Sequence, residues 1–263
     1  MKHILMASLA LAVLAPTAAF AQSGFDGTWK ADVSSAKPPE KPSEYRLKDG
    51  MYSCKTCVPS YSIKADGMDH PISGNKYVDS VALKIVDDHT TQETDKRGGK
   101  VVATSTQTAS ADGNSLTIAF SDASNSNGAP VTGKANAVRV GKMVAGEHAT
   151  SGMWRTTSYS DISDNGISVT YKTNGDMLTM TAPTGQSYTA KTDGSEAPMK
   201  GDPGITSVSV KMMGKNMLEE TDKRGAKVVG VSKMTLEPDG KTIDIVYQDK
   251  LHGTSMSYKA AKQ

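Results

Sequence analysis

The chain contains two cysteines, Cys54 and Cys57, separated by two residues. In an oxidising compartment an isolated pair at this spacing most simply forms a disulfide, which here would clip the end of a hairpin. A thioredoxin-like redox pair would need a βαβ context, and attachment of c-type haem would need a histidine where Val58 stands. A structural zinc ion would need two further ligands. We therefore predict a disulfide between Cys54 and Cys57.

Two tryptophans occupy equivalent places, in Gly27-Thr-Trp29 and in Gly152-Met-Trp154. A ring of this size can stack on a ligand, or it can fill one end of a barrel. The sequence leaves both roles open for Trp29 and Trp154, and we favour the plug over the ligand contact.

Four basic residues lie in two identical segments, Asp95-Lys-Arg-Gly98 and Asp222-Lys-Arg-Gly225. Each segment predicts a tight turn that is capped by its aspartate and ended by a glycine able to adopt positive φ. The alternative is a pair of positively charged tips that contact an anionic group or a protein partner. The residues concerned are Lys96, Arg97, Lys223 and Arg224.

No motif for catalysis or metal binding is recognisable. The sequence has no Gly-rich phosphate loop, nucleophile elbow or zinc motif, and its histidines have no metal-ligand spacing. The carboxylates are scattered, and we expect them to cap turns. We therefore expect no catalytic residue, no metal and no cofactor. The histidines beyond the N-terminal segment are His70, His89, His148 and His252.

Methionines gather in the C-terminal half of the chain. Thioethers can bind Cu(I), but methionine more often fills irregular gaps in a core. A third interpretation is that they line an apolar pocket. Notable among them are Met177, Met180, Met212, Met213 and Met217.

The sequence contains a duplicated unit. Residues 60–122 align without a gap with residues 187–249, and 25 of these 63 positions are identical, which indicates a tandem repeat. Upstream the offset falls from 127 to 125, as the pairing of Trp29 with Trp154 shows. We predict one repeat over 22–145 and a second over 146–263.

The elements that must position these residues are strands. Residues 78–86 alternate, with Val81, Leu83 and Ile85 on one face, and turn dipeptides such as Asp66-Gly67 follow the strands. We expect eight or nine antiparallel strands per repeat, and closure into a barrel would remove the exposed sheet edges that proteins avoid. The prediction is an all-β protein of two tandem up-and-down barrels. The alternative is one larger sheet or barrel shared by both repeats.

The first residues predict export. Lys2 and His3 precede an apolar run at 4–14 that is too short to span a bilayer, and Ala19-Phe-Ala21 is a typical cleavage site. We predict a signal peptide over 1–21, cleaved before Gln22, and a periplasmic protein, with secretion as the alternative. No later segment is apolar enough for a transmembrane helix. The formal net charge of +2 does not indicate binding to nucleic acid or anionic membranes.

The Gly27-Thr-Trp29 opening resembles the Gly-x-Trp motif on the first strand of the lipocalin-like superfamily. A longer pattern also resembles a group of small exported bacterial proteins whose function is not settled. It runs from Gly27-Thr-Trp-Lys30 through Asp66-Gly67, Pro71-x-x-Gly74 and Ser80-Val-Ala-Leu-Lys84 to Lys96-Arg-Gly-Gly-Lys100. The resemblance implies a calyx-shaped barrel that binds a small apolar molecule.

These observations favour a periplasmic binding or carrier protein for a small apolar ligand, with a cavity of roughly 300 Å³ or more. The first alternative is a structural or protein-interaction module of the cell envelope that has no ligand. A hydrolase is a remote alternative. The expected partners are a small apolar ligand or an envelope protein.

Overall fold

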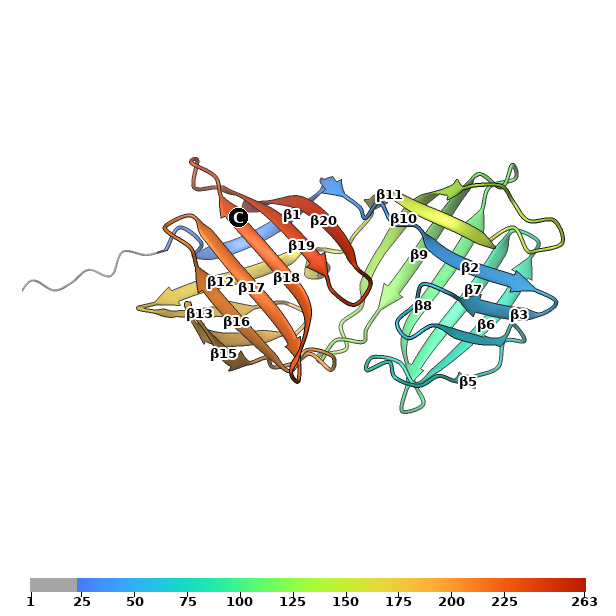
Figure 1. Cartoon of the computed structure of the whole chain (residues 1–263), viewed down its shortest axis with the longest axis horizontal. Coiled ribbons are helices and arrows are strands. Elements are labelled where there is room, and N and C mark those ends of the chain that lie inside the picture. Colours follow the sequence, from blue (N-terminus) through green and yellow to red (C-terminus); the bar gives the residue numbers. More distant parts are fainter. Residues whose placement is uncertain (1–22) are drawn as a thin grey trace, which may run out of the picture.

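The computed structural model describes residues 23–263, which form two antiparallel sheets of ten strands each (Figure 1). Each sheet curls into a nearly closed barrel, so the predicted all-β barrel architecture is confirmed. The predicted signal peptide lies outside the described residues. The described part also contains a 3-10 helix, η1 (Asp164–Gly166). Within residues 23–263, no helix has the length and apolar character that a membrane span requires.

Barrel 1, at the right of Figure 1, is built from one continuous stretch of chain. In spatial order its strands are β4 (Tyr61–Lys64), β3 (Met51–Cys54), β2 (Ser43–Lys48), β11 (Gly152–Ser160), β10 (Val131–Val140), β9 (Ser115–Asp122), β8 (Lys100–Ala109), β7 (Thr90–Arg97), β6 (Ser80–Asp87) and β5 (His70–Pro71).

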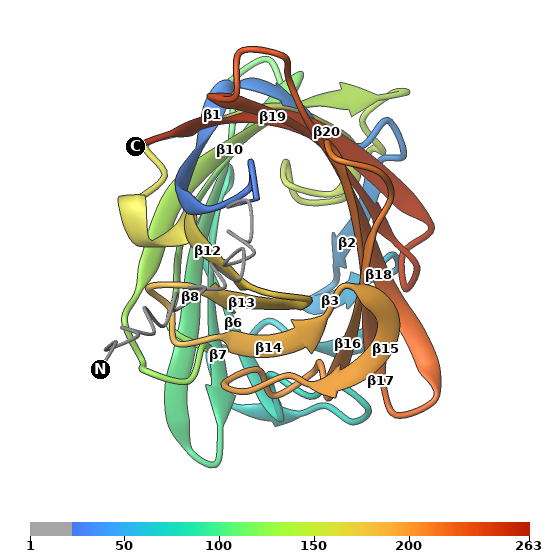
Figure 2. The ribbon, with the colours of Figure 1, turned by 90° about the vertical axis from the view of Figure 1, so that its left-hand side faces the viewer.

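Barrel 2 is built from two separate stretches, and Figure 2 shows it end-on. In spatial order its strands are β14 (Ser187–Lys191), β13 (Met177–Thr181), β12 (Ser168–Asn174), β1 (Gly27–Lys37), β20 (Thr254–Lys262), β19 (Thr242–Asp249), β18 (Lys227–Leu236), β17 (Met217–Arg224), β16 (Ser207–Met212) and β15 (Asp193–Pro198).

Isolated bridges bring the two edges of each sheet together. In barrel 2 the backbone amide of Ser187 donates to the carbonyl of Lys200 at 3.0 Å, and the amide of Lys200 donates to the carbonyl of Ser187 at 2.8 Å. In barrel 1 the amide of Gly67 donates to the carbonyl of Leu83 at 2.8 Å. Each barrel has more strands than the eight or nine expected per repeat, because elements as short as β5, with two residues, show no alternation in sequence.

Each barrel contains the first strand of the other repeat. Strand β1 of repeat 1 pairs with β12 and β20, so that Trp29 lies opposite Val169 and Lys262. Strand β11 of repeat 2 pairs with β10 and β2, so that Trp154 lies opposite Arg139 and Ser43. The repeats therefore divide the sequence at 145/146, whereas barrel 1 spans 43–160 and barrel 2 combines 27–37 with 168–262.

Two segments carry the chain between the barrels, at 38–42 and at 161–167. The first is the proline-rich run after β1, and prolines cannot donate to a β-ladder. The second contains η1. Strands β1 and β11 therefore both end at the junction between the barrels, and both begin at the outer end of the barrel that contains them (Figure 1).

Alternation along the strands fills the barrels with apolar side chains. On β16, Val208 and Val210 are fully buried, whereas Ser209 and Lys211 lie at or near the surface. Barrel 2 has one continuous core cluster, and the core of barrel 1 is divided into two smaller clusters. Because side chains occupy the lumen, space for a ligand must be sought near the barrel ends.

Candidate functional site

A cavity of about 230 Å³ lies beside the junction, at the end of barrel 2 that faces barrel 1. We call it the mouth cavity. Its lining is mainly apolar and combines strands β1 and β20 of barrel 2 with Tyr159 of β11, in barrel 1, and with the segment that crosses from β11 to β12. The lining residues are Ala31, Asp32, Val33, Ala36, Tyr159, Ile162, Gly166, Ile167, Met256 and Tyr258.

The mouth cavity is the open end of the lumen of barrel 2. Trp29 on β1 is buried in the core, and alternation places Ala31 and Val33 on the same face of that strand. On β20, Ala260 is buried, and Met256 lies on the same face of the strand as Ala260. The lumen-facing side chains of these two strands thus line the cavity.

The outer end of barrel 2 is filled by Trp29, whose side chain is 1% exposed. Its indole Nε1 donates to the carbonyl of Phe25 at 2.7 Å. Barrel 1 repeats the arrangement, since Nε1 of Trp154 donates to the carbonyl of Thr150 at 2.8 Å. Both rings close barrel ends away from the mouth cavity, and ligand contact at either ring stays a prediction.

Steric constraints require glycine at the first position of both Gly-x-Trp segments. Gly27 and Gly152 have φ of 127° and 135°, which side-chain-bearing residues rarely adopt. A Cβ on Gly27 would lie 2.6 Å from Cε of Lys262, whose Nζ lies 5.3 Å from the centroid of the Trp29 ring. A Cβ on Gly152 would overlap Arg139, whose guanidinium carbon lies 4.1 Å from the Trp154 ring. Each glycine leaves room for a cation on its tryptophan.

A carboxyl group lies inside barrel 2. Leu218, Glu220 and Asp222 alternate inward along β17, and all three are at least 91% buried. The hydroxyl of Tyr188 donates to Oε2 of Glu220 at 2.5 Å. The ring of Tyr171, from β12, is also buried, and its hydroxyl lies 3.5 Å from Sδ of Met234. The centre of the lumen is thus lined by tyrosines around a carboxyl group.

Asp222 lies beside this group with an unpartnered oxygen. Its side chain is 93% buried, and Oδ1 has no hydrogen-bond partner. Its Oδ2 and the hydroxyl of Tyr247 both pack against Gly230, where a Cβ would lie 3.1 Å from Oδ2 and 2.7 Å from that hydroxyl. Leaving a buried carboxyl oxygen unpaired costs free energy.

Burial raises the pKa of both carboxyls. Desolvation, followed by the charge of Asp222, raises the pKa of Glu220 to about 8. Desolvation, followed by the charge of Asp202, raises the pKa of Asp222 to about 6. Asp202 itself accepts a hydrogen bond of 2.9 Å from Tyr77 of repeat 1. The two carboxyls therefore hold protons more tightly than ordinary acidic side chains.

Barrel 1 contains the equivalent pair, Glu93 and Asp95 on β7. Desolvation raises the pKa of Glu93 to about 8 and that of Asp95 to about 6, and Oδ1 of Asp95 has no partner. The surroundings differ, however. Thr91 stands where barrel 2 has Leu218, Ala103 where it has Gly230, and Thr156 where it has Ala31. The acid pair is shared by the repeats, whereas the apolar mouth belongs to barrel 2.

The turns that contain the predicted basic tips form at Gly98 and Gly225, which have positive φ as expected. The expected aspartate caps are wrong: Asp95 and Asp222 lie inside strands, two residues before the turns, so their side chains point into the barrels. At the tips, Nζ of Lys96 lies 2.6 Å from Asp69, and Nζ of Lys223 lies 2.6 Å from the equivalent Glu196. The Nε of Arg224 donates to the carbonyl of Gly204 at 2.7 Å, and Arg97 is exposed. Partner contact through these residues stays a prediction.

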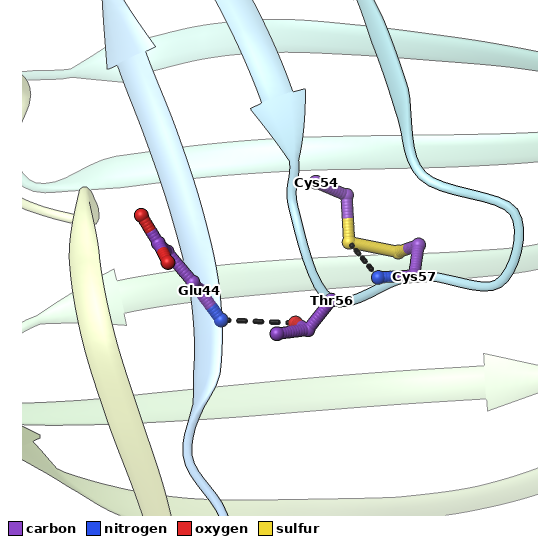
Figure 3. The surroundings of a disulfide bond; sticks show 4 residues. All are labelled: Glu44, Cys54, Thr56 and Cys57. Atoms are coloured by element: carbon purple, nitrogen blue, oxygen red, sulfur yellow. Dashed lines mark hydrogen bonds between the residues drawn. A yellow bond between two sulfur atoms is a disulfide. The ribbon is translucent and has the colours of Figure 1, made fainter. Parts of the chain in front are cut away.

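The predicted disulfide between Cys54 and Cys57 is confirmed, and it lies where β3 leads toward β4 (Figure 3). The segment it closes continues the hydrogen bonding of β2. The amide of Glu44 donates to Oγ1 of Thr56 at 2.9 Å, and the amide of Lys55 donates to the carbonyl of Glu44 at 3.0 Å. The disulfide therefore braces one end of this hairpin in barrel 1 only.

The remaining candidates do not converge. Among residues 23–263, no three His, Cys, Asp or Glu side chains are grouped as metal ligands. Of the methionines, Met180 and Met212 pack in or against the core of barrel 2, and Met213 and Met217 lie beside the hairpin turn between β16 and β17. His70 and His252 contact Asp66 and Asp249 at the surface, at 2.8 and 2.6 Å.

Sequence reasoning missed the acid pairs, because the carboxylates were expected to cap turns. A signal for them was present. Glu93-Thr-Asp95 recurs as Glu220-Thr-Asp222, and the two-residue spacing places both carboxyls on one face of a strand. Leu218 lies on the same face of β17 as Glu220 and Asp222, and this apolar residue indicates that the face is buried. The mouth cavity itself depends on the exchange of β1, which the repeat does not reveal.

No protein-family model matches the chain, and no curated protein sequence matches it.

Proposed function

We propose that this is an exported binding protein that holds a small, predominantly apolar molecule in the mouth cavity. The observation that carries the proposal is the cavity of about 230 Å³ where lumen-facing side chains of barrel 2 meet the crossing segment. Binding sites for small molecules are concave and mostly apolar, with a few polar groups that fix orientation. A cavity smaller than the expected 300 Å³ favours a ligand smaller than a typical drug.

Other features support the same proposal. The barrel fold and the Gly-x-Trp opening agree with a lipocalin-like carrier, in which one end of a barrel admits the ligand. The Trp29 plug at the outer end leaves the junction end as the route of access. The disulfide supports an oxidising compartment such as the periplasm.

Filling the mouth cavity should abolish binding. Ala31→Phe adds a ring where the side chain now leaves space, and we expect n-hexanol to bind about tenfold or more weakly, because apolar contact area is lost. Isothermal titration calorimetry on the mature chain measures this affinity.

The matched control is Thr156→Phe, which adds a ring at the equivalent position on β11 in barrel 1. Its affinity for hexanol should stay within about twofold of the unchanged protein, because it lies outside the mouth cavity. Hexanol that fails to bind the unchanged protein, or binds the Ala31→Phe variant equally well, would contradict the proposal.

A further inference from the structure

The acid pair of barrel 2 has no cationic partner among the described residues. The nearest basic residues along β17 are engaged elsewhere, since Lys223 pairs with Glu196 and Arg224 donates to the carbonyl of Gly204. Glu220 receives one hydrogen bond, from Tyr188, and Oδ1 of Asp222 receives none. Buried carboxylates are normally paired with a cation or a metal.

The strand that holds the pair is connected to the mouth cavity through continuous backbone pairing. Backbone pairing places Glu220 opposite Ser232, Ser232 opposite Tyr247, and Tyr247 opposite Met256, which lines the cavity. Asp222 lies one inward-facing position closer to the junction. The apolar cavity and the carboxyls thus face the same lumen, on strands that pair continuously from β17 to β20.

Tyr258 connects the two regions. Its side chain lines the mouth cavity, and the charge of Glu220 adds to desolvation in raising the pKa of its hydroxyl. Aromatic rings beside a carboxylate form a surface that attracts organic cations through both the ring face and the charge. The tyrosines around Glu220 provide such a surface.

We propose that Glu220 and Asp222 bind the positively charged nitrogen of the ligand whose apolar part fills the mouth cavity. The ligand is then an amphiphilic amine. This inference rests on the proposed function and adds the chemical class of the ligand. A protonated amine supplies the hydrogen-bond donors that Oδ1 of Asp222 lacks.

The experiment compares three ligands with the same six-carbon chain: n-hexylammonium, n-hexanol and n-hexanoate. Titration calorimetry at about pH 8.5 keeps the alkylamine protonated and favours the ionised carboxyls. We expect the unchanged protein to bind hexylammonium about tenfold more tightly than hexanol, and hexanoate most weakly, because charge-assisted hydrogen bonds are the strong ones.

The decisive variant is Glu220→Gln combined with Asp222→Asn, which keeps side-chain size and removes both charges. It should bind hexylammonium and hexanol equally, and its retained affinity for hexanol would show that the barrel is folded. The control variant is Glu93→Gln combined with Asp95→Asn in barrel 1, which should keep the preference for hexylammonium.

The outcomes separate the two proposals. Equal affinity of the unchanged protein for hexylammonium and hexanol would overturn the amine assignment and leave the apolar site intact. Failure of hexanol to bind the unchanged protein would overturn the apolar site and, with it, the amine assignment that rests on that site. Loss of the preference in the barrel 1 variant instead of the barrel 2 variant would overturn the placement at Glu220 and Asp222.

Discussion

At the scale of single residues, two equivalent oxygens define the interior chemistry of the barrels. Oδ1 of Asp95 and Oδ1 of Asp222 are both buried and unpartnered. Each belongs to an acid pair that is identical between repeats in which most aligned positions differ. A single unsatisfied atom could be an accident of packing, but its recurrence in both barrels indicates a maintained feature. Their sequence signal was the recurrent Glu-Thr-Asp spacing, and it becomes a site only because that face of the strand points inward.

The acid pairs should make stability depend on pH. The pKa of Glu220 rises from its ordinary 4.5 to about 8 on folding, chiefly by desolvation, so the folded protein retains a proton that the unfolded chain releases. Stability should therefore fall as pH rises from about 4.5 to about 8, and level off above that. Glu220→Gln cannot titrate and should make the slope shallower, as measured by the urea midpoint across this range.

The control for this prediction is Glu219→Gln on the outer face of β17, where Glu219 contacts Lys233 at 3.5 Å. This variant should keep the slope of the unchanged protein. A Glu220→Gln variant with an unaltered slope would show that Glu220 does not retain its proton on folding. Asp222 and the barrel 1 pair contribute in the same direction, so part of the slope should persist in Glu220→Gln.

At the scale of elements, local patterns predicted the strands and turns well, because their determinants are local. The alternation around Val81 and Leu83 predicted a half-buried strand, and both residues are buried on β6. The glycines of the basic turns have the expected positive φ. The position of Asp95 was wrong, because the sequence does not show at which residue a strand ends and its turn begins. The disulfide was predictable from two cysteines in one short segment.

Removing the disulfide should destabilise barrel 1 selectively. Cys54→Ser combined with Cys57→Ser opens a loop of few residues, and the chain-entropy model gives a cost of about 2 kcal/mol. Hydrogen exchange measured by mass spectrometry should show faster exchange in β3 and β4. The equivalent strands β13 and β14 of barrel 2, which have no disulfide, serve as the internal reference, and equal acceleration there would contradict the local role.

At the scale of the whole molecule, barrel 1 is inserted into barrel 2. Residues 43–160 contain all ten strands of the barrel 1 sheet, with no strand from the other described residues, whereas barrel 2 needs β1 from before that stretch and β12 to β20 from after it. The duplication was visible in the sequence, but the exchange was not. The exchange was not visible because β1 and β11 are equivalent strands, so that each could take the place of the other in its sheet. Only the paths of 38–42 and 161–167 distinguish the two arrangements.

This organisation predicts which fragment folds alone. Residues 43–160 should give a cooperative unfolding transition and dispersed amide resonances, because they contain all ten strands of barrel 1 and the Trp154 plug. Residues 22–145 cover repeat 1 but lack β11, and they carry β1 without its partners. This fragment should be poorly folded, and native-like spectra from it would show that β1 can replace β11 within one repeat.

The exchange of β1 also sets an order of events during synthesis. Strand β1 emerges before every other described strand, yet its partners lie more than a hundred residues later, with Trp29 opposite Val169 and Lys262. Barrel 1 can close while β1 is still unpaired, because the first strand that pairs with β1 is β12, which is synthesised after barrel 1. Contacts that span so much of the chain form slowly and leave unpaired strands exposed in the interval. Strand β20, the last described strand, pairs with β1, so barrel 2, with the mouth cavity, closes only when β20 has been synthesised.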